Sequence, residues 1–168
     1  MFYQNRIMTL ELLNISVGTL TAGLSLTASP GQIVCLEGGA ASGKTTLLRA
    51  ILGFVPTSAG LITYDGELLT PLSAPYLRRY VAYVPQHLSV PDGCTDIPTS
   101  YLPLLQRAVA QHRPLLIADE PAEPLTADEA ALADQLLQEA ARGGAAVVAV
   151  NARSYTSKIL IENKSIAP

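Results

Sequence analysis

The fold of this chain follows from one stretch, Gln32-Ile-Val-Cys-Leu-Glu-Gly-Gly-Ala-Ala-Ser-Gly-Lys-Thr-Thr-Leu-Leu48. A short apolar run at residues 33–36 comes before a glycine-rich turn, and apolar residues at helical spacing come after it. The turn contains Gly38-x-x-x-x-Gly43-Lys44-Thr45. A strand, this turn and a helix in that order predict a P-loop, in which backbone N–H groups and the helix N-terminus hold phosphates.

The P-loop predicts a role for each of its residues. Lys44 is expected to reach the β- and γ-phosphates of a nucleotide, and the Thr45 hydroxyl to help hold Mg²⁺. The competing interpretation, a chance glycine-rich turn, does not account for the matched motif and both of its flanks. The expected cofactors are therefore ATP and Mg²⁺, and the expected cofactor-binding residues are Gly38, Gly39, Ala40, Ala41, Ser42, Gly43, Lys44, Thr45 and Thr46.

Composition limits the class of protein. A chain of 168 residues, 49% of them hydrophobic, is expected to form a single domain over residues 1–168. The net charge is −3 and the basic residues are scattered apart from Arg78-Arg79, so we expect no nucleic-acid partner. No apolar run is long enough for a membrane span and the N-terminus lacks a signal-peptide core, which predicts no direct membrane insertion. Cys35 and Cys94 have no metal-type spacing, which favours a reducing, cytoplasmic setting.

The rest of the chain alternates strand and helix patterns. We predict an N-terminal antiparallel β part, a mostly parallel sheet and flanking helices, which together make an α/β P-loop NTPase core. The helix that starts at the capping box of Thr126 and Glu129 is expected to bury Leu132, Leu136 and Ala140. The predicted strands are 8–16, 20–29, 33–36, 81–84, 114–118, 145–150 and an edge strand at 158–162, with a hairpin over 61–69, helices at 73–80, 101–111 and 126–142, and a loop at 88–100.

Two carboxylates follow the buried strand 114–118. ATP hydrolysis needs a carboxylate for the metal and a group that acts on the attacking water. We expect Asp119 to bind Mg²⁺ and Glu120 to act on that water, because open α/β sheets bind their ligands at the carboxyl ends of the strands. The two residues would lie beside the P-loop if the two strands are neighbours. The alternative is a solvated turn, which the presence of the P-loop makes the weaker interpretation.

At this point the chain resembles the ATPases of the ATP-binding cassette (ABC) family. Leu115-Leu-Ile-Ala-Asp-Glu-Pro121, after Gln106-Arg-Ala-Val-Ala-Gln-His-Arg-Pro114, is similar to their Walker B region, and Tyr83-Val-Pro-Gln86 is similar to their Q-loop. The resemblance runs over nearly the whole chain. It implies that Gln86 contacts Mg²⁺ and the attacking water and relays the nucleotide state to a permease. The implied catalytic residues are Glu120 and Gln86, the implied metal ligands are Thr45, Gln86 and Asp119, and an ordinary loop glutamine is the alternative for Gln86.

The chain also departs from the family. The family has a Leu-Ser-Gly-Gly-Gln signature shortly before the position of Arg107, where this chain has Thr99-Ser-Tyr-Leu-Pro-Leu-Leu105. Asp119 follows Gln86 by only 33 residues, so the helical subdomain that the family has between these positions is expected to be largely deleted. A homodimer of this chain would have no signature with which to cover either nucleotide.

Further family positions differ. The switch histidine expected after strand 147–150 is replaced by Asn151 or Ala152, and the D-loop has the sequence Ala122-Glu-Pro-Leu-Thr126. No aromatic residue stands near residues 16–20 to stack on adenine, although Phe2 or Tyr3 would serve if the N-terminus folds back.

The leading hypothesis is an ATP-binding subunit of an ABC-type transporter that hydrolyses Mg·ATP slowly, if at all, without a partner. Its expected partners are a transmembrane permease and, as a further option, a signature-bearing ABC ATPase in a heterodimer; its expected place is the cytoplasm or the inner face of the cell membrane. The alternative is a non-hydrolysing regulatory or structural nucleotide-binding protein. A P-loop kinase is a third interpretation, but no acceptor-binding lid is recognisable.

Overall fold

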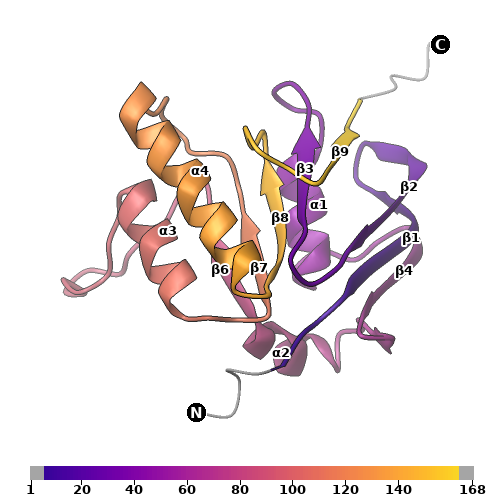
Figure 1. Cartoon of the computed structure of the whole chain (residues 1–168). Helices are drawn as coiled ribbons and strands as arrows, with labels where there is room; N and C mark the ends of the chain where they lie inside the picture. The colour runs from indigo at the N-terminus through magenta and orange to yellow at the C-terminus, as the bar shows by residue number, and fades with distance from the viewer. Residues whose placement is uncertain (1–5, 163–168) are drawn as a thin grey trace.

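The computed structural model describes residues 6–162 of the chain, which form two sheets with a helix between them (Figure 1). Sheet A has the strand order β2-β1-β4-β5 and its pairings are antiparallel. Sheet B has the order β6-β7-β8-β3-β9 and its pairings are parallel. The predicted α/β class, with an antiparallel N-terminal part and a parallel sheet, is confirmed.

Sheet A comprises β1 (Leu10–Val17), β2 (Leu20–Ala28), β4 (Ala59–Tyr64) and β5 (Glu67–Leu68). The turn between β4 and β5 has positive φ at both Asp65 (50°) and Gly66 (79°), as the predicted hairpin requires. The pairing of β1 with β4 contains an irregularity near Asn14, which faces Gly60. Gly60 has a φ of 89°, and a Cβ there would lie 2.4 Å from the main-chain oxygen of Asn14. Only glycine fits at this position, where the two strands approach each other closely.

Sheet B comprises β3 (Ile33–Glu37), β6 (Val81–Val84), β7 (Leu115–Ala118), β8 (Ala146–Val150) and β9 (Ser157–Leu160). The strands β7 and β8 are buried along their whole length, as their continuous apolar runs predict for a parallel sheet covered on both faces. The strand β9 is the edge strand beside β3. The strands β3 and β7 are not neighbours, because β8 lies between them. The sequence places Asp119 beside the P-loop on the condition that these two strands are neighbours, and that condition is not met.

Helices cover both faces of sheet B. Helix α1 (Lys44–Ile51) packs between the two sheets, and its predicted apolar face is confirmed by the buried side chains of Leu47, Leu48, Ile51 and Leu52. Helices α3 (Tyr101–Ala110) and α4 (Ala127–Arg142) lie side by side on the opposite face (Figure 1). The short helix α2 (Ala74–Leu77) and the 3₁₀ turn η1 (Arg78–Tyr80) lead into β6, and residues 88–100 contain no helix or strand.

Helix α4 begins with the predicted capping box, in which Glu129 N donates to Thr126 Oγ1 and Thr126 N donates to a Glu129 side-chain oxygen. The predicted buried stripe was partly wrong. Leu136 and Leu137 are buried, whereas Leu132 is 37% exposed. Leu136, Leu137 and Ala141 are the buried residues of the α4 face that packs against α3 and sheet B, Ala133 and Ala140 are partly buried beside them, and the 100° turn per residue puts Leu132 at the edge of that face.

Candidate functional site

The loop between β3 and α1 has the tight curvature that the P-loop motif predicts. Ala41 (φ 57°) and Gly43 (φ 97°) adopt the left-handed conformation. A Cβ on Gly38 would lie 2.6 Å from the Ile161 main-chain oxygen and 2.7 Å from Ser42 Oγ. Glycine at position 38 is therefore required by close packing against the chain that follows β9 and against the far side of the loop.

Lys44 lies inside this loop. Its side chain is only 7% exposed. The Nζ atom donates to the main-chain oxygens of Gly38 (2.6 Å) and Gly39 (2.5 Å) and to Ser42 Oγ (3.1 Å). All three acceptors are neutral, so a buried positive charge is held at the concave side of the loop, where it favours an anionic ligand.

The two predicted metal ligands on the P-loop helix and after β7 come together. Thr45 Oγ1 donates to Asp119 Oδ2 at 3.0 Å, and Asp119 is 2% exposed. The other carboxylate oxygen, Oδ1, accepts a hydrogen bond from Glu120 N at 2.8 Å. The pair meets even though β8 separates the two strands, because the parallel strands of sheet B end at one edge and the first turn of α1 lies at that edge.

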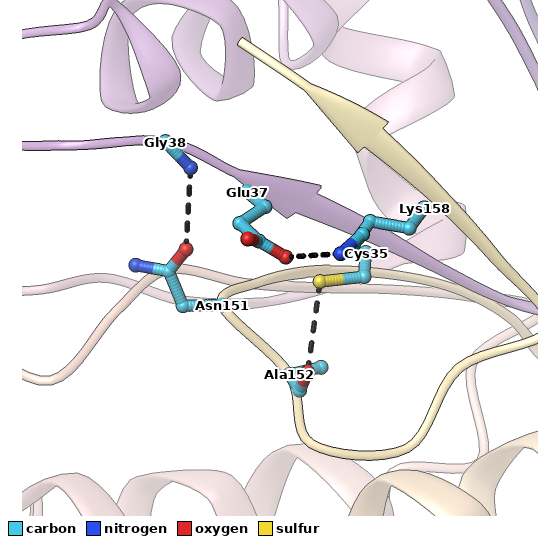
Figure 2. A network of polar contacts seen from close by, with 6 residues as sticks. All are labelled: Cys35, Glu37, Gly38, Asn151, Ala152 and Lys158. Carbon is cyan, nitrogen blue, oxygen red and sulfur yellow. Dashed lines mark hydrogen bonds and ion pairs between the residues drawn. The ribbon is translucent and has the colours of Figure 1, made fainter.

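Asn151 links the P-loop to Glu120. Its side-chain nitrogen Nδ2 donates to Glu120 Oε1 at 3.0 Å, and its Oδ1 accepts from Gly38 N at 3.4 Å. Figure 2 shows the second of these bonds, with the amide of Asn151 pointing toward the start of the loop. Asn151 has a φ of 50° and follows β8, the strand that lies between β3 and β7. From the sequence, Asn151 was recognised only as one of two residues that replace the switch histidine. Its place directly after strand 145–150, which ends at the same sheet edge as the other site residues, is the signal that could have indicated its role.

The neighbouring contacts of β3 are weaker. Lys158 Nζ and Glu37 form an ion pair of 2.9 Å in which both side chains are more than a third exposed, so it adds little stability (Figure 2). Cys35 Sγ donates to the Ala152 main-chain oxygen at 3.6 Å. Burial raises the pKa of the Cys35 thiol, so this sulfur is kept protonated beside the site.

A cavity of about 510 Å³ borders Glu120, and Gln86 and Tyr101 line it. The structure thus brings Gln86 to the same cavity as the proposed catalytic carboxylate. A larger cavity of about 590 Å³ is lined by Arg6, His112 and residues at the start of β7, and it contains none of the motif residues. The smaller cavity is therefore the one that belongs with the site.

Tyr101 was not recognised from the sequence as a site residue. Its hydroxyl donates to the main-chain oxygen of Asp119 at 2.5 Å. Burial raises the pKa of Tyr101 far above its ordinary value, and the charges of Asp119 and Glu120 raise it further, so the phenol stays protonated and remains a donor. No local pattern marks this tyrosine, because its role depends on how α3 docks against sheet B.

The donor set fits Mg²⁺. A hydroxyl and a carboxylate lie together at Thr45 and Asp119, and Mg²⁺ prefers oxygen ligands that it shares with phosphate and water. Within residues 6–162 there is no group of three His, Cys, Asp or Glu side chains that could hold a metal ion. The site therefore suits a metal that arrives with a phosphate ligand rather than one held by the protein alone.

The turn between β1 and β2 lies against the P-loop. A Cβ on Gly43 would lie 3.5 Å from Thr19 Oγ1, and one on Gly18 would lie 3.4 Å from the Thr46 methyl group. The aromatic residues considered for stacking on the base, Phe2 and Tyr3, lie outside the described residues. Across residues 6–162, no helix is both long and apolar enough to cross a bilayer.

Strand, glycine-rich loop, helix and a carboxylate pair on a parallel sheet define the class of P-loop nucleotide-binding domains. Residues 21–97 match the family model of ABC transporters. In structure, the chain is similar to one described as the ATP-binding subunit of an ABC transporter, with a TM-score of 0.75 over 92% of this chain and 86% of that chain at 19% identity. This likeness concerns the fold.

Sequence relatives agree with the family match. An ABC transporter ATP-binding protein from Haemophilus influenzae is 39% identical over 85 residues, which is 48% of this chain and 32% of that protein. The cytochrome c biogenesis ATP-binding export protein CcmA from Hyphomonas neptunium is 29% identical over 155 residues, covering 77% of this chain and 80% of the relative. The chain thus spans about a third of the first relative and most of the second. These matches show that the chain is similar to the ATP-binding domains of ABC transporters.

Proposed function

We propose that the chain binds Mg·ATP and serves as the ATP-binding subunit of an ABC-type transporter. The observation that carries this proposal is the hydrogen bond between Thr45 and Asp119 beside the buried Lys44. It brings together a phosphate-binding cation and two oxygen ligands from distant parts of the chain. The names of the relatives, an ATP-binding protein and an ATP-binding export protein, support the same assignment.

Each residue of the site has a defined task in this proposal. The loop 38–46 binds the phosphates, and Lys44 stabilises their charge. Thr45, Asp119 and Gln86 hold Mg²⁺, which when bound neutralises phosphate charge. Glu120 accepts a hydrogen bond from Asn151 at one carboxylate oxygen and orients the attacking water with the other.

Partners follow from what the chain retains and lacks. The proposal includes a transmembrane permease, with Gln86 at the surface cavity as the relay, and a location in the cytoplasm at the inner face of the membrane. Turnover by the chain alone is slow because the stretch 99–105, which leads into α3 and includes its first residues, supplies no signature.

A second candidate, a nucleotide-binding protein without turnover, is favoured by one observation. Residues 88–100 contain neither helix nor strand, so the structure has no helical subdomain between β6 and α3. Without that subdomain a permease has less surface on which to act. Stimulation of ATP turnover by a permease would exclude this second candidate.

Nucleotide binding is tested by Lys44→Ala, which removes the buried cation from the loop. We expect the affinity for Mg·ATP, measured by isothermal titration calorimetry, to fall more than tenfold, which corresponds to about 1.4 kcal/mol. Arg49→Ala is the matched control, because it removes one exposed positive charge from the same helix and should bind as the wild type does. Circular dichroism and thermal melting check that both variants fold. Equal affinities for wild type and Lys44→Ala would contradict the proposal.

A further inference from the structure

Tyr101 is the first residue of α3, and its phenol reaches the segment that carries the two carboxylates. We propose that Tyr101 is a positioning residue, which orients the Asp119 carboxylate for Mg²⁺ through the peptide unit between Asp119 and Glu120. This inference rests on the proposed function, since it concerns the metal-dependent part of nucleotide binding.

The peptide unit between Asp119 and Glu120 is held at both of its polar ends. Its carbonyl oxygen, on Asp119, accepts the Tyr101 hydroxyl at 2.5 Å. Its N–H, on Glu120, donates to Asp119 Oδ1 at 2.8 Å. Rotation of this peptide would therefore move the N–H that fixes the carboxylate. Tyr101, on α3, restrains that rotation because its hydroxyl holds the carbonyl end of the peptide unit.

Sheet B does not supply this restraint. The register of β7 with β8 ends at Ala118 and Ala149, so the Asp119 carbonyl lies past the end of that ladder. The Asp119 N–H is held by the Val84 main-chain oxygen at 2.8 Å, which anchors the residue on the other side of its Cα. The Tyr101 hydroxyl therefore supplies a hydrogen bond to the Asp119 carbonyl, which lies beyond the ladder between β7 and β8.

The phenol is itself fixed in place. The Tyr101 ring packs against the buried cluster formed by α3, α4 and one face of sheet B. It also lines the cavity that Gln86 and Glu120 share. The orientation of the metal-binding carboxylate thus depends on the docking of α3, the helix that directly follows the mostly exposed residues 88–100.

Tyr101→Phe tests this, because it removes the hydroxyl and keeps the ring. ATP affinity is measured by calorimetry with Mg²⁺ and with excess EDTA. We expect Mg·ATP affinity to fall about three- to tenfold, the fold-change that corresponds to one hydrogen bond. Affinity in EDTA should stay within about twofold of wild type, since the P-loop and Lys44 are untouched. Tyr76→Phe, the same deletion on the exposed tyrosine of α2, whose hydroxyl is hydrogen-bonded to that of Tyr80, is the control and should behave as wild type.

The outcomes separate this inference from the proposed function. A wild type whose affinity gains nothing from Mg²⁺ would overturn both. A wild type that gains from Mg²⁺, with the same gain in Tyr101→Phe, would overturn only the positioning role. Equal losses with and without Mg²⁺ would also overturn it, because a purely structural tyrosine would weaken both complexes alike. Thermal melting of each variant establishes that the measured affinities belong to folded protein.

Discussion

Asn151 directly follows β8 and has a backbone conformation that few residues adopt. Its φ of 50° lies in the left-handed region, where asparagine is better tolerated than most side chains. From there its amide reaches both Gly38 and Glu120, and its own N–H donates to the Leu36 main-chain oxygen at 2.9 Å. A neutral amide can donate and accept at once, so one side chain ties the phosphate loop to the carboxylate.

We expect Asn151→Gly to lower the free energy of unfolding by about 1 kcal/mol, because glycine keeps the left-handed backbone but loses the long hydrogen bond from Gly38 N as well as the hydrogen bond to Glu120. In a Glu120→Ala background the same change should cost clearly less, since the bond is already absent. Urea unfolding of the four proteins in this double-mutant cycle gives the coupling. Equal costs in both backgrounds would mean that Asn151 does not act on Glu120.

The close approach of β4 to β1 in sheet A requires glycine at position 60 for a steric reason. Gly60 and Gly66 both have positive φ, at 89° and 79°, but their surroundings differ. A Cβ on Gly60 would meet main-chain atoms of Leu13 and Asn14 at 2.4 to 2.6 Å, whereas a Cβ on Gly66 would meet nothing within 4 Å. Comparing alanine substitutions at the two positions therefore separates the cost of backbone strain from the cost of a clash with the neighbouring strand.

We expect Gly66→Ala to lower the free energy of unfolding by about 1 kcal/mol, from the left-handed backbone alone. Gly60→Ala should cost about 2 kcal/mol more, because strand β1 must also shift to admit the methyl group. Chemical denaturation of the two variants measures this difference. Similar losses of stability in both variants would show that β1 shifts easily, and that position 60 does not require glycine.

Most elements could be predicted because their signals are local. The P-loop motif fixed β3 and α1, the capping box of Thr126 and Glu129 fixed the start of α4, and the continuous apolar runs marked β7 and β8. The order of the strands in sheet B could not be predicted in this way. Strand order depends on which apolar faces meet in three dimensions, and so the place of β8 between β3 and β7 was missed.

The same limit explains what was missed in the site. Lys44, Thr45 and Asp119 belong to motifs whose spacing encodes their chemistry, and their convergence follows from strands that end at one edge. Tyr101 acts through the docking of a helix, and Asn151 through its place between two strands. Neither depends on a local spacing, so only the assembled fold reveals them.

The molecule as a whole presents an asymmetric set of functional groups. Sheet A, α1 and sheet B hold the P-loop on a continuous buried core, so the groups for the chain's own nucleotide rest on a rigid support. The segment between β6 and α3, where the family resemblance places the helical subdomain and the signature, is a mostly exposed loop. Under the proposed function, the chain keeps the groups that bind its own nucleotide and lacks the signature that it would supply to a second ATPase subunit.

This asymmetry favours a heterodimer, and it leads to a prediction about turnover. We expect the isolated chain to hydrolyse ATP slowly or undetectably, with any residual rate abolished in Glu120→Gln. A signature-bearing ABC ATPase should co-purify with it in the presence of ATP and raise the rate, because its signature can cover the nucleotide on this chain. Changing the signature serine of that partner should abolish both association and stimulation. An ATP-dependent homodimer of this chain in solution, or fast turnover unchanged in Glu120→Gln, would rule the heterodimer out.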